Sequence, residues 1–437
     1  MTGSSVLYAI SSSTDPTGSW TFGNVNTTYS INSVATWADQ PTISSNGSYL
    51  DVTSAQFGVA SGQYVDNAVT IIPLSGGPVN AYAFANAADY RPVAVSGGTC
   101  YVAYTGDALS IMSNNNVSSN FTSASISLGS IDVGNGAYTA AQRGSGVLLD
   151  AGDGAVANAV YANGYIYAVF EVMPPGSTQP AAHWAKIDVS NNSLVAQGNI
   201  TGPGGAAAFN PSIAVDANGD VLVNFTSSSS STYPGAFAAV MPAGSSSFLA
   251  PVQYGSSNAP EAATFGVTNN VIRWGDYSTA VADPSAANGF VVSNEIVPSA
   301  QSLSNNAPWA TVTADVTLSG SSSAAVVTAS STSTPPSSST ASVNHSPLTA
   351  ATDTENHWFH VPATVASLDA ANLPSFGPIL EGGSSGFDRD AHSRGSLALF
   401  VNHMASAFVD RSVGFMGSPM EDPARATTPQ FLTKPHG

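Results

Sequence analysis

The chain has 437 residues, of which 43% are hydrophobic and only 8% are charged. This length can bury a large core, and a charged fraction far below the usual value of about 25% leaves a surface of small and uncharged polar residues. Such surfaces are typical of secreted and cell-surface proteins. The chain has only nine Lys and Arg residues against 27 Asp and Glu, which gives a net charge of −18. This shortage of cations argues against nucleic acid or an anionic membrane surface as a partner, because both require clustered cations.

Cysteine content and hydropathy exclude further classes of protein. Cys100 is the single cysteine, so the chain has no intramolecular disulfide and no thiolate metal cage. It lies in an alternating apolar run with Val102 and Tyr104 and is predicted to be a small buried residue. No apolar stretch approaches the roughly 20 residues of a membrane span, and the first residues lack the basic start of a signal peptide.

The first predicted elements are two strands joined by a turn. Residues 6–10 form the first strand, residues 15–18 the turn, and Trp20 begins the second strand. The run Ser-Thr-Asp-Pro-Thr-Gly-Ser-Trp at 13–20 resembles an expanded Asp-box, a turn whose Asp accepts backbone N–H bonds while its Trp packs between sheets. We expect this hairpin either to close a ring against residues 273–296 or to follow further strands upstream.

A pattern of strand, tight turn and strand then recurs five times. Its turns carry Asn-Gly or Gly-Gly pairs, which supply the positive φ angles of tight hairpins. The five copies span residues 40–52, 91–102, 158–169, 210–223 and 273–295. Their spacing of roughly 50 to 70 residues is that of four-stranded blades with variable loops. Because one hairpin has too little surface to bury alone, radial stacking is favoured, and we predict an all-β fold, a β-propeller of five to seven blades.

The remaining segments divide the chain into three parts. Residues 1–318 are assigned to the propeller, with residues 309–318 supplying a strand of the last blade. Residues 319–350 are rich in Ser, Thr and Pro and are predicted to be a flexible linker. Residues 351–437 form a separate C-terminal segment with one amphipathic helix from about 393 to 410. That helix needs a partner surface, so the segment is a candidate for directing secretion or assembly.

The motif Arg273-Trp274-Gly275-Asp276-Tyr277-Ser278 is the most specific part of a family resemblance that covers roughly residues 5–318. Together with residues 13–20, 149–153 and 211–215 it is similar to the bacterial secreted sialidase-like exoproteins with Asp-box repeats. The resemblance implies a propeller fold and an extracellular or cell-surface location. Members mostly have no established activity, so it implies no reaction.

Two interpretations of function remain open. The favoured one is a non-catalytic module that binds or displays glycans or a surface protein outside the cell. The alternative is a sialidase-like glycoside hydrolase, in which an arginine cluster holds a sugar carboxylate and a Tyr–Glu pair acts as nucleophile. Its candidate residues are Arg91, Arg143, Arg273 and Glu295. Each arginine has an equally simple structural role, as a residue that fixes a junction between blades.

Further residues are candidates for ligand or metal binding. At the mouth of the central channel, Asp276, Tyr277 and Glu295 are candidates for contacting a sugar or a cation, whereas Trp274 is expected to fill the gap between blades. The acidic loop of Asp150 and Asp153 contains a glycine and is a candidate calcium site. Apart from this possible Ca²⁺, we predict no cofactor. The histidines of residues 357–403 lack the spacing of a zinc site, and the acidic residues of 216–220 are explained by a hairpin turn.

Overall fold

The computed structural model describes residues 4–318 except 14, 16, 85–87, 118, 135, 263–266, 276 and 299–309, together with the backbone of 325–328 and 430–431. The described residues form strands and a single short 3₁₀ turn, η1 (Pro203–Gly205). Within this part of the chain, no helix has the length and hydropathy needed to cross a membrane. The predicted linker lies outside the described residues apart from 325–328, and so does the predicted C-terminal helix.

Five antiparallel sheets follow one another along the chain. The first has the order β28-β7-β6-β5-β4-β3, with β3 (Tyr29–Ile31), β4 (Val34–Ser45), β5 (Tyr49–Gly58), β6 (Tyr64–Pro73), β7 (Asn80–Ala83) and β28 (Gln430–Phe431). The second comprises β8 (Arg91–Val95), β9 (Gly98–Tyr104), β10 (Ala108–Asn114) and β11 (Thr122–Ser127). The third comprises β14 (Val156–Ala162), β15 (Tyr165–Val172), β16 (Ala181–Asp188) and β17 (Ser193–Ile200).

The last two of these sheets and two smaller ones complete the fold. The fourth sheet comprises β18 (Ala207–Val215), β19 (Val221–Ser229), β20 (Thr232–Met241) and β21 (Val252–Ser256). The fifth comprises β24 (Thr279–Ala282), β25 (Gly289–Ile296), β26 (Ala310–Leu318) and β27 (Ala325–Thr328). The smaller sheets are the hairpin of β1 (Ser5–Ser11) and β2 (Trp20–Asn26), and a mixed sheet of β12 (Thr139–Ala140), β13 (Leu148–Asp150), β23 (Val271–Ile272) and β22 (Val267–Thr268).

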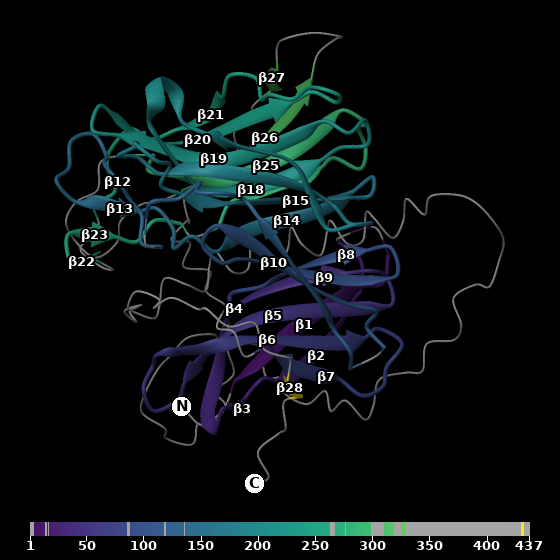
Figure 1. Cartoon of the computed structure of the whole chain (residues 1–437). Coiled ribbons are helices and arrows are strands. Elements are labelled where there is room, and N and C mark those ends of the chain that lie inside the picture. The colour runs from purple at the N-terminus through teal and green to yellow at the C-terminus, as the bar shows by residue number, and fades with distance from the viewer. Residues whose placement is uncertain are drawn as a thin grey trace, which may run out of the picture.

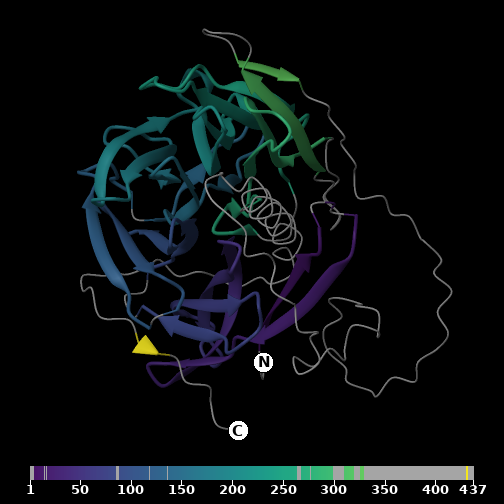
Figure 2. The same ribbon diagram turned by 90° about the vertical axis from the view of Figure 1, so that its right-hand side faces the viewer.

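The architecture is a β-propeller, as the hairpin repeats predict. The innermost strands β4, β8, β14, β18 and β24 contact one another in sequence order. Figure 1 shows the first and second sheets in the lower half of the molecule and the fourth and fifth in the upper half. Seen from the side in Figure 2, the sheets follow the chain around a common centre, and the β1–β2 hairpin lies between the first sheet and the last.

Each predicted hairpin is present, and its local chemistry explains it. Asn163 and Gly164 join β14 to β15 with φ angles of 53° and 86°, the left-handed pair that a tight turn requires. The strand at the fifth repeat begins later than the motif does, at Thr279, because residues 273–275 lie in a loop. The β1–β2 turn also has the expected bond, since Asp15 Oδ1 accepts the backbone N–H of Thr17 at 2.9 Å.

Bulges and side-chain bonds join the inner strands. The pairing of β4 with β5 shifts register between Asp39 and Thr42, and that of β18 with β19 shifts between Phe209 and Ser212. Each bulge contains a residue with positive φ before a proline, Gln40 at 49° and Asn210 at 47°. Side chains of one inner strand accept backbone N–H groups of the next. Ser44 Oγ accepts from Ala94 at 2.8 Å, and Asn158 Oδ1 accepts from Ile213 at 3.0 Å.

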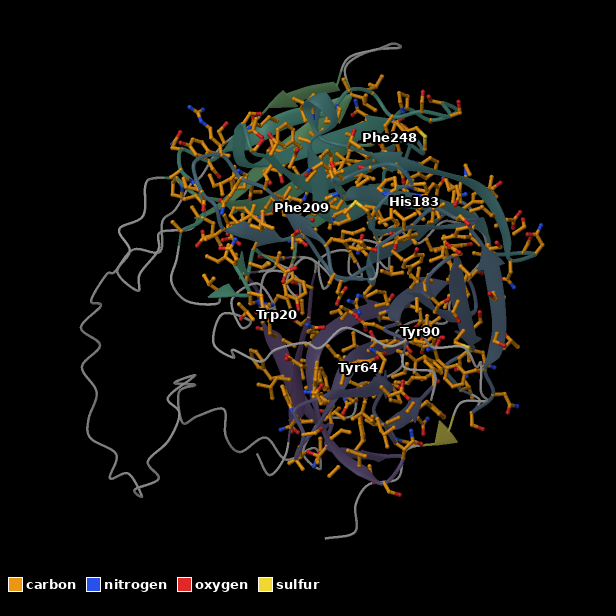
Figure 3. The ribbon with its side chains drawn as sticks, turned by 60° about the vertical axis from the view of Figure 1, so that its left-hand side comes forward. Trp20, Tyr64, Tyr90, His183, Phe209 and Phe248 are labelled. Carbon is orange, nitrogen blue, oxygen red and sulfur yellow. The ribbon has the colours of Figure 1, made fainter. Side chains whose placement is uncertain are left out.

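The core lies between neighbouring sheets, as radial stacking requires. One apolar cluster joins the second and third sheets, another joins the third and fourth, and another joins the fourth and fifth. Figure 3 draws the side chains and labels Tyr90 and Phe209, two fully buried rings that belong to further apolar clusters. Cys100 is 3% exposed, which confirms its predicted burial. Both strands of a hairpin therefore contribute to the apolar layer against a neighbouring blade, as Val93 of β8 and Cys100 of β9 do.

Candidate functional site

A buried ion pair marks the start of the second blade. Arg91 is the first residue of β8, and its Nη1 lies 2.7 Å from Asp89 Oδ1. Both side chains are 13% exposed. Burial raises the pKa of Asp89 even though Arg91 beside it acts in the opposite direction. Burial disfavours the charge of Arg91, but Asp89 more than offsets this, so the pKa of Arg91 stays above its ordinary value. The pair therefore carries almost no net charge toward a ligand.

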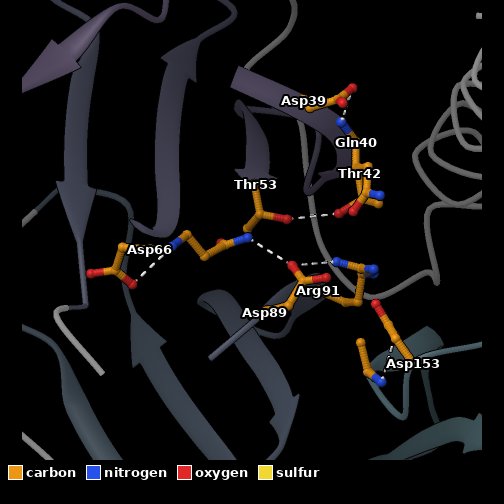
Figure 4. A network of polar contacts seen from close by, with 10 residues as sticks. Asp39, Gln40, Thr42, Thr53, Asp66, Asp89, Arg91 and Asp153 are labelled. Atoms are coloured by element: carbon orange, nitrogen blue, oxygen red, sulfur yellow. Dashed lines mark hydrogen bonds and ion pairs between the residues drawn. The ribbon is translucent and has the colours of Figure 1, made fainter. Parts of the chain in front are cut away.

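Asn67 connects this pair to the first blade. Its Nδ2 donates to Asp89 Oδ1 at 2.7 Å, and its backbone N–H donates to Asp66 Oδ1 at 2.8 Å. Figure 4 shows Asp66, Asp89 and Arg91 in this network. Asn67 has no exposed surface, yet its Oδ1 has no hydrogen-bond partner within the described part of the chain; the same holds for Arg91 Nε and Tyr64 OH. Three buried polar atoms on neighbouring side chains thus lack a hydrogen-bond partner in the part of the chain that the structure describes.

The acidic loop of Asp150 and Asp153 meets the pair from the other side. Asp153 lies beside Arg91 in Figure 4, and its Oδ1 accepts the N–H of Ala155 at 3.0 Å. Burial raises the pKa of Asp150, opposed by the Gly152 N–H and by the charge of Arg273. No group of three or more His, Cys, Asp or Glu side chains in the described ranges is arranged to hold a metal ion. Among the described residues the two aspartates thus have no third ligand of these kinds, and the calcium site remains a prediction.

Glu171 is a fully enclosed acid behind this loop. Its Oε1 accepts the backbone N–H of Asn210 at 2.9 Å, and Asn210 Nδ2 in turn donates to the carbonyl of Gly275 at 2.6 Å. Burial, with a smaller contribution from Asp153, raises the pKa of Glu171 to about 8. Glu171 is therefore largely protonated at neutral pH and couples the third blade to the fourth and to the loop before the fifth.

This pKa predicts how stability depends on pH. The folded-state pKa of Glu171, about 8, lies above its ordinary value of 4.5, so its contribution is fully present below about pH 4.5 and is lost as pH rises to about 8. We expect Glu171→Gln to flatten the fall of the melting temperature between about pH 6 and 8. As a control, Asp51→Asn should act at lower pH, because burial raises the pKa of Asp51 to about 6. An unchanged slope in Glu171→Gln, measured by differential scanning calorimetry, would contradict the assignment.

Trp274 has the structural role predicted for it. It is 2% exposed, lies in a cluster with Tyr138 and Phe209, and donates from Nε1 to Thr226 Oγ1 at 3.2 Å. The Glu295 carboxylate packs against the next residue, Gly275, where a Cβ would lie 2.3 Å from Oε2.

Of the other two predicted channel-mouth residues, only Tyr277 is among the described residues. Tyr277 is half-buried and interacts electrostatically with Arg91. Asp276 lies outside the described residues. Tyr277 is therefore within electrostatic range of Arg91.

The three candidate arginines have different partners. Arg91 pairs with Asp89, and Arg273 acts on Asp150. Arg143 is exposed, with its guanidinium 5.1 Å from the ring centre of Tyr233. Arg91 and Arg273 thus interact electrostatically with the same acidic loop, whereas Arg143 stacks on a separate ring. A three-arginine carboxylate clamp finds no support in these contacts.

An aromatic row that the sequence did not reveal leads to this cluster. Trp37 on β4 stacks on Phe57 of β5, with ring centres 5.3 Å apart at 30°. Phe57 meets Tyr64 of β6 edge to face at 5.8 Å. All three rings are half-buried, and Tyr64 also interacts electrostatically with Asp89 and Asp66. The signal lies in the strand pairing, because Trp37 pairs with Phe57 and Phe57 with Tyr64.

Comparisons with known proteins give only distant likenesses. No protein-family model matches the chain, and a search of curated proteins finds no match. Three similar solved structures are the β-propeller domain of the trilobed protease from Pyrococcus furiosus, the α-L-arabinofuranosidase from Podospora anserina in complex with cellotriose, and a polysaccharide lyase that acts as an ulvan lyase.

The overlap with each of the three is loose. Their identities are 6, 12 and 8%, and the TM-scores are 0.32, 0.33 and 0.34. The matches cover 67, 62 and 65% of this chain and 80, 88 and 67% of theirs. Values this low transfer no activity to this chain, so its function has to be inferred from its own residues.

Proposed function

We propose that this β-propeller binds carbohydrate outside the cell, at the rim where its inner strands begin. One observation carries the proposal: the half-buried row of Trp37, Phe57 and Tyr64 ends at the polar cluster of Asp89 and Arg91. Ligand sites combine apolar and aromatic walls with a few fixed polar groups. Aromatic rings pack on the apolar face of a sugar, and the polar groups pair with its hydroxyls. The low charge content of the chain fits an extracellular surface.

The aromatic row provides the test. We expect Trp37→Ala and Phe57→Ala each to weaken oligosaccharide binding about tenfold or more, because each removes aromatic area that would be desolvated on binding. The measurement is isothermal titration calorimetry of the full chain against a panel of oligosaccharides. The panel contains neutral chains of glucose, xylose, mannose and galactose, and chains ending in uronic or sialic acid.

A matched control distinguishes the effect of losing a ring of this row from the effect of losing any half-buried aromatic side chain. Tyr165 on β15 is also half-buried, and it lies under the ammonium of Lys186, 4.0 Å from its ring centre. It belongs to another blade, so Tyr165→Ala should leave affinity unchanged. If Trp37→Ala binds every responding sugar as well as the parent chain does, the row is not the binding surface.

Hydrolysis of a glycosidic bond is a second candidate, and one observation favours it. Glu171 holds a proton at neutral pH and lies beside Asp150 and Asp153, and glycosidases pair a protonated acid with a carboxylate. A sialidase-type reaction would also use Arg91, Arg273 and Glu295. Appearance of shortened oligosaccharides in the titrated samples, or of free sialic acid from a sialylated one, would support this candidate.

A further inference from the structure

We propose that Tyr64, Asn67 and Arg91 form a subsite that receives neighbouring hydroxyl groups of a neutral sugar unit. The inference rests on the proposed carbohydrate function and specifies the ligand class at that site. It places one sugar unit at the inner end of the aromatic row, where Tyr64 is both the last ring and the first polar contact. The argument uses the unpartnered atoms, the charges around them and the route by which they reach solvent.

The unpartnered atoms match what a hydroxyl group offers. Asn67 Oδ1 is an acceptor, Arg91 Nε–H is a donor, and Tyr64 OH is both, and none of these atoms has a hydrogen-bond partner among the described residues. A buried polar atom left unpaired costs roughly 1–3 kcal/mol. A sugar hydroxyl donates and accepts at once, so one hydroxyl can accept from Arg91 and donate to Asn67. A neighbouring hydroxyl can then pair with Tyr64.

The surrounding charges select a neutral ligand. The charge of Arg91 is already balanced by Asp89 at 2.7 Å, so its Nε–H can donate to a ligand without offering an unpaired cation. Asp66 and Asp153 both act on Tyr64 electrostatically, and they would repel the carboxylate of a uronic or sialic acid. Removing a sugar carboxylate from water next to these aspartates is costly unless a free cation meets it. The subsite therefore disfavours the acidic sugars that a sialidase would bind.

The cluster reaches the surface through its ion pair and its tyrosine. Asp89 and Arg91 each keep 13% of the side chain exposed, and Tyr64 is half-buried. Because the Tyr64 hydroxyl itself is buried, the next unit of a sugar packed on Phe57 would reach it only after a shift of the Tyr64 side chain. The competing occupant is ordered water, which also pairs with buried polar atoms. Water and a sugar make different predictions for a variant that removes only the hydroxyl.

The decisive variant is Tyr64→Phe. Since the hydroxyl has no hydrogen-bond partner among the described residues, its removal should leave the melting temperature unchanged or raise it slightly. Affinity for the neutral oligosaccharides that bind the parent chain should fall about tenfold, as expected for the loss of one buried hydrogen bond. The measurements are isothermal titration calorimetry and a thermal melt of the full chain.

A tyrosine of the same sheet serves as the matched control. Tyr29 OH is hydrogen-bonded to Thr70 Oγ1 at 2.8 Å, and its side chain is 2% exposed. Tyr29→Phe should therefore lower the melting temperature and leave affinity unchanged. The two phenylalanine variants thus have opposite signatures, one in binding and the other in stability.

Three results would overturn the proposal, and they are distinguishable. Unchanged affinity in Tyr64→Phe, with binding lost in Trp37→Ala, assigns the unpartnered atoms to water and leaves the proposed function standing. Preferential binding of the uronic- or sialic-acid chains rejects the assignment of a neutral sugar to the subsite, but it leaves the carbohydrate function standing. No binding of any oligosaccharide up to roughly 10 mM rejects the subsite and the carbohydrate function together.

Discussion

Replacing Gly152 with alanine should lower the free energy of unfolding by roughly 3 kcal/mol. Gly152 has a φ of 94°, and a Cβ there would lie 2.7 Å from Glu171 Cδ and 2.8 Å and 2.9 Å from its two carboxyl oxygens. An L-residue is strained at this φ, and the carboxyl cannot retreat without losing its bond from the Asn210 N–H. Urea unfolding followed by tryptophan fluorescence measures the loss.

Gly164 supplies the matched control because it has the backbone strain without the clash. Its φ is 86°, and a Cβ there would meet nothing within 4 Å. Gly164→Ala should therefore cost only about 1 kcal/mol, the contribution of the left-handed conformation. Equal losses in the two variants would show that contact with Glu171 contributes nothing. We also expect Gly152→Ala to shift the pH profile of stability, because displacement of the Glu171 carboxyl changes its burial.

Removing the charge of Arg91 should have a comparable effect. Arg91→Met leaves Asp89 largely buried without its counter-ion, which typically costs about 3–5 kcal/mol. Burial already raises the pKa of Asp89 with Arg91 in place, and loss of the cation raises it further. A folded-state pKa above the unfolded one gives stability that is present at low pH and lost as pH rises. The deficit of Arg91→Met should therefore shrink as pH falls through the raised folded-state pKa of Asp89 toward the ordinary pKa of an aspartate.

The double variant Asp89→Asn with Arg91→Met tests the cause. An amide at position 89 carries no charge and can still accept the hydrogen bond from Asn67 Nδ2, so most of the lost stability should return. If the double variant is no more stable than Arg91→Met at pH 7, the loss comes from packing around Arg91. The measurement is urea unfolding at several pH values, with the pH dependence of each variant fitted separately.

Some site residues could be predicted because they belong to the repeat itself. Arg91 and Asn210 each precede a proline of an inner strand, β8 and β18, and residues 273–275 precede β24, so radial stacking of the blades brings them toward one centre. The sequence therefore placed Tyr277 at the channel mouth, but it offered Arg91 only for an arginine cluster or a blade junction and the acidic loop only as a calcium site. It did not separate Arg143 from the other arginines, because stacking on Tyr233 depends on a loop between sheets.

The sequence by itself determined the hairpins and hence the propeller class. Asn-Gly and Gly-Gly turns act within a few residues, and alternation along a strand fixes which face is buried. Tertiary structure alone decided the site. The row of Trp37, Phe57 and Tyr64 depends on cross-strand register, and the meeting of Asp89 with Asp153 depends on how separate sheets pack. Such contacts join residues far apart in the chain, so no local pattern encodes them.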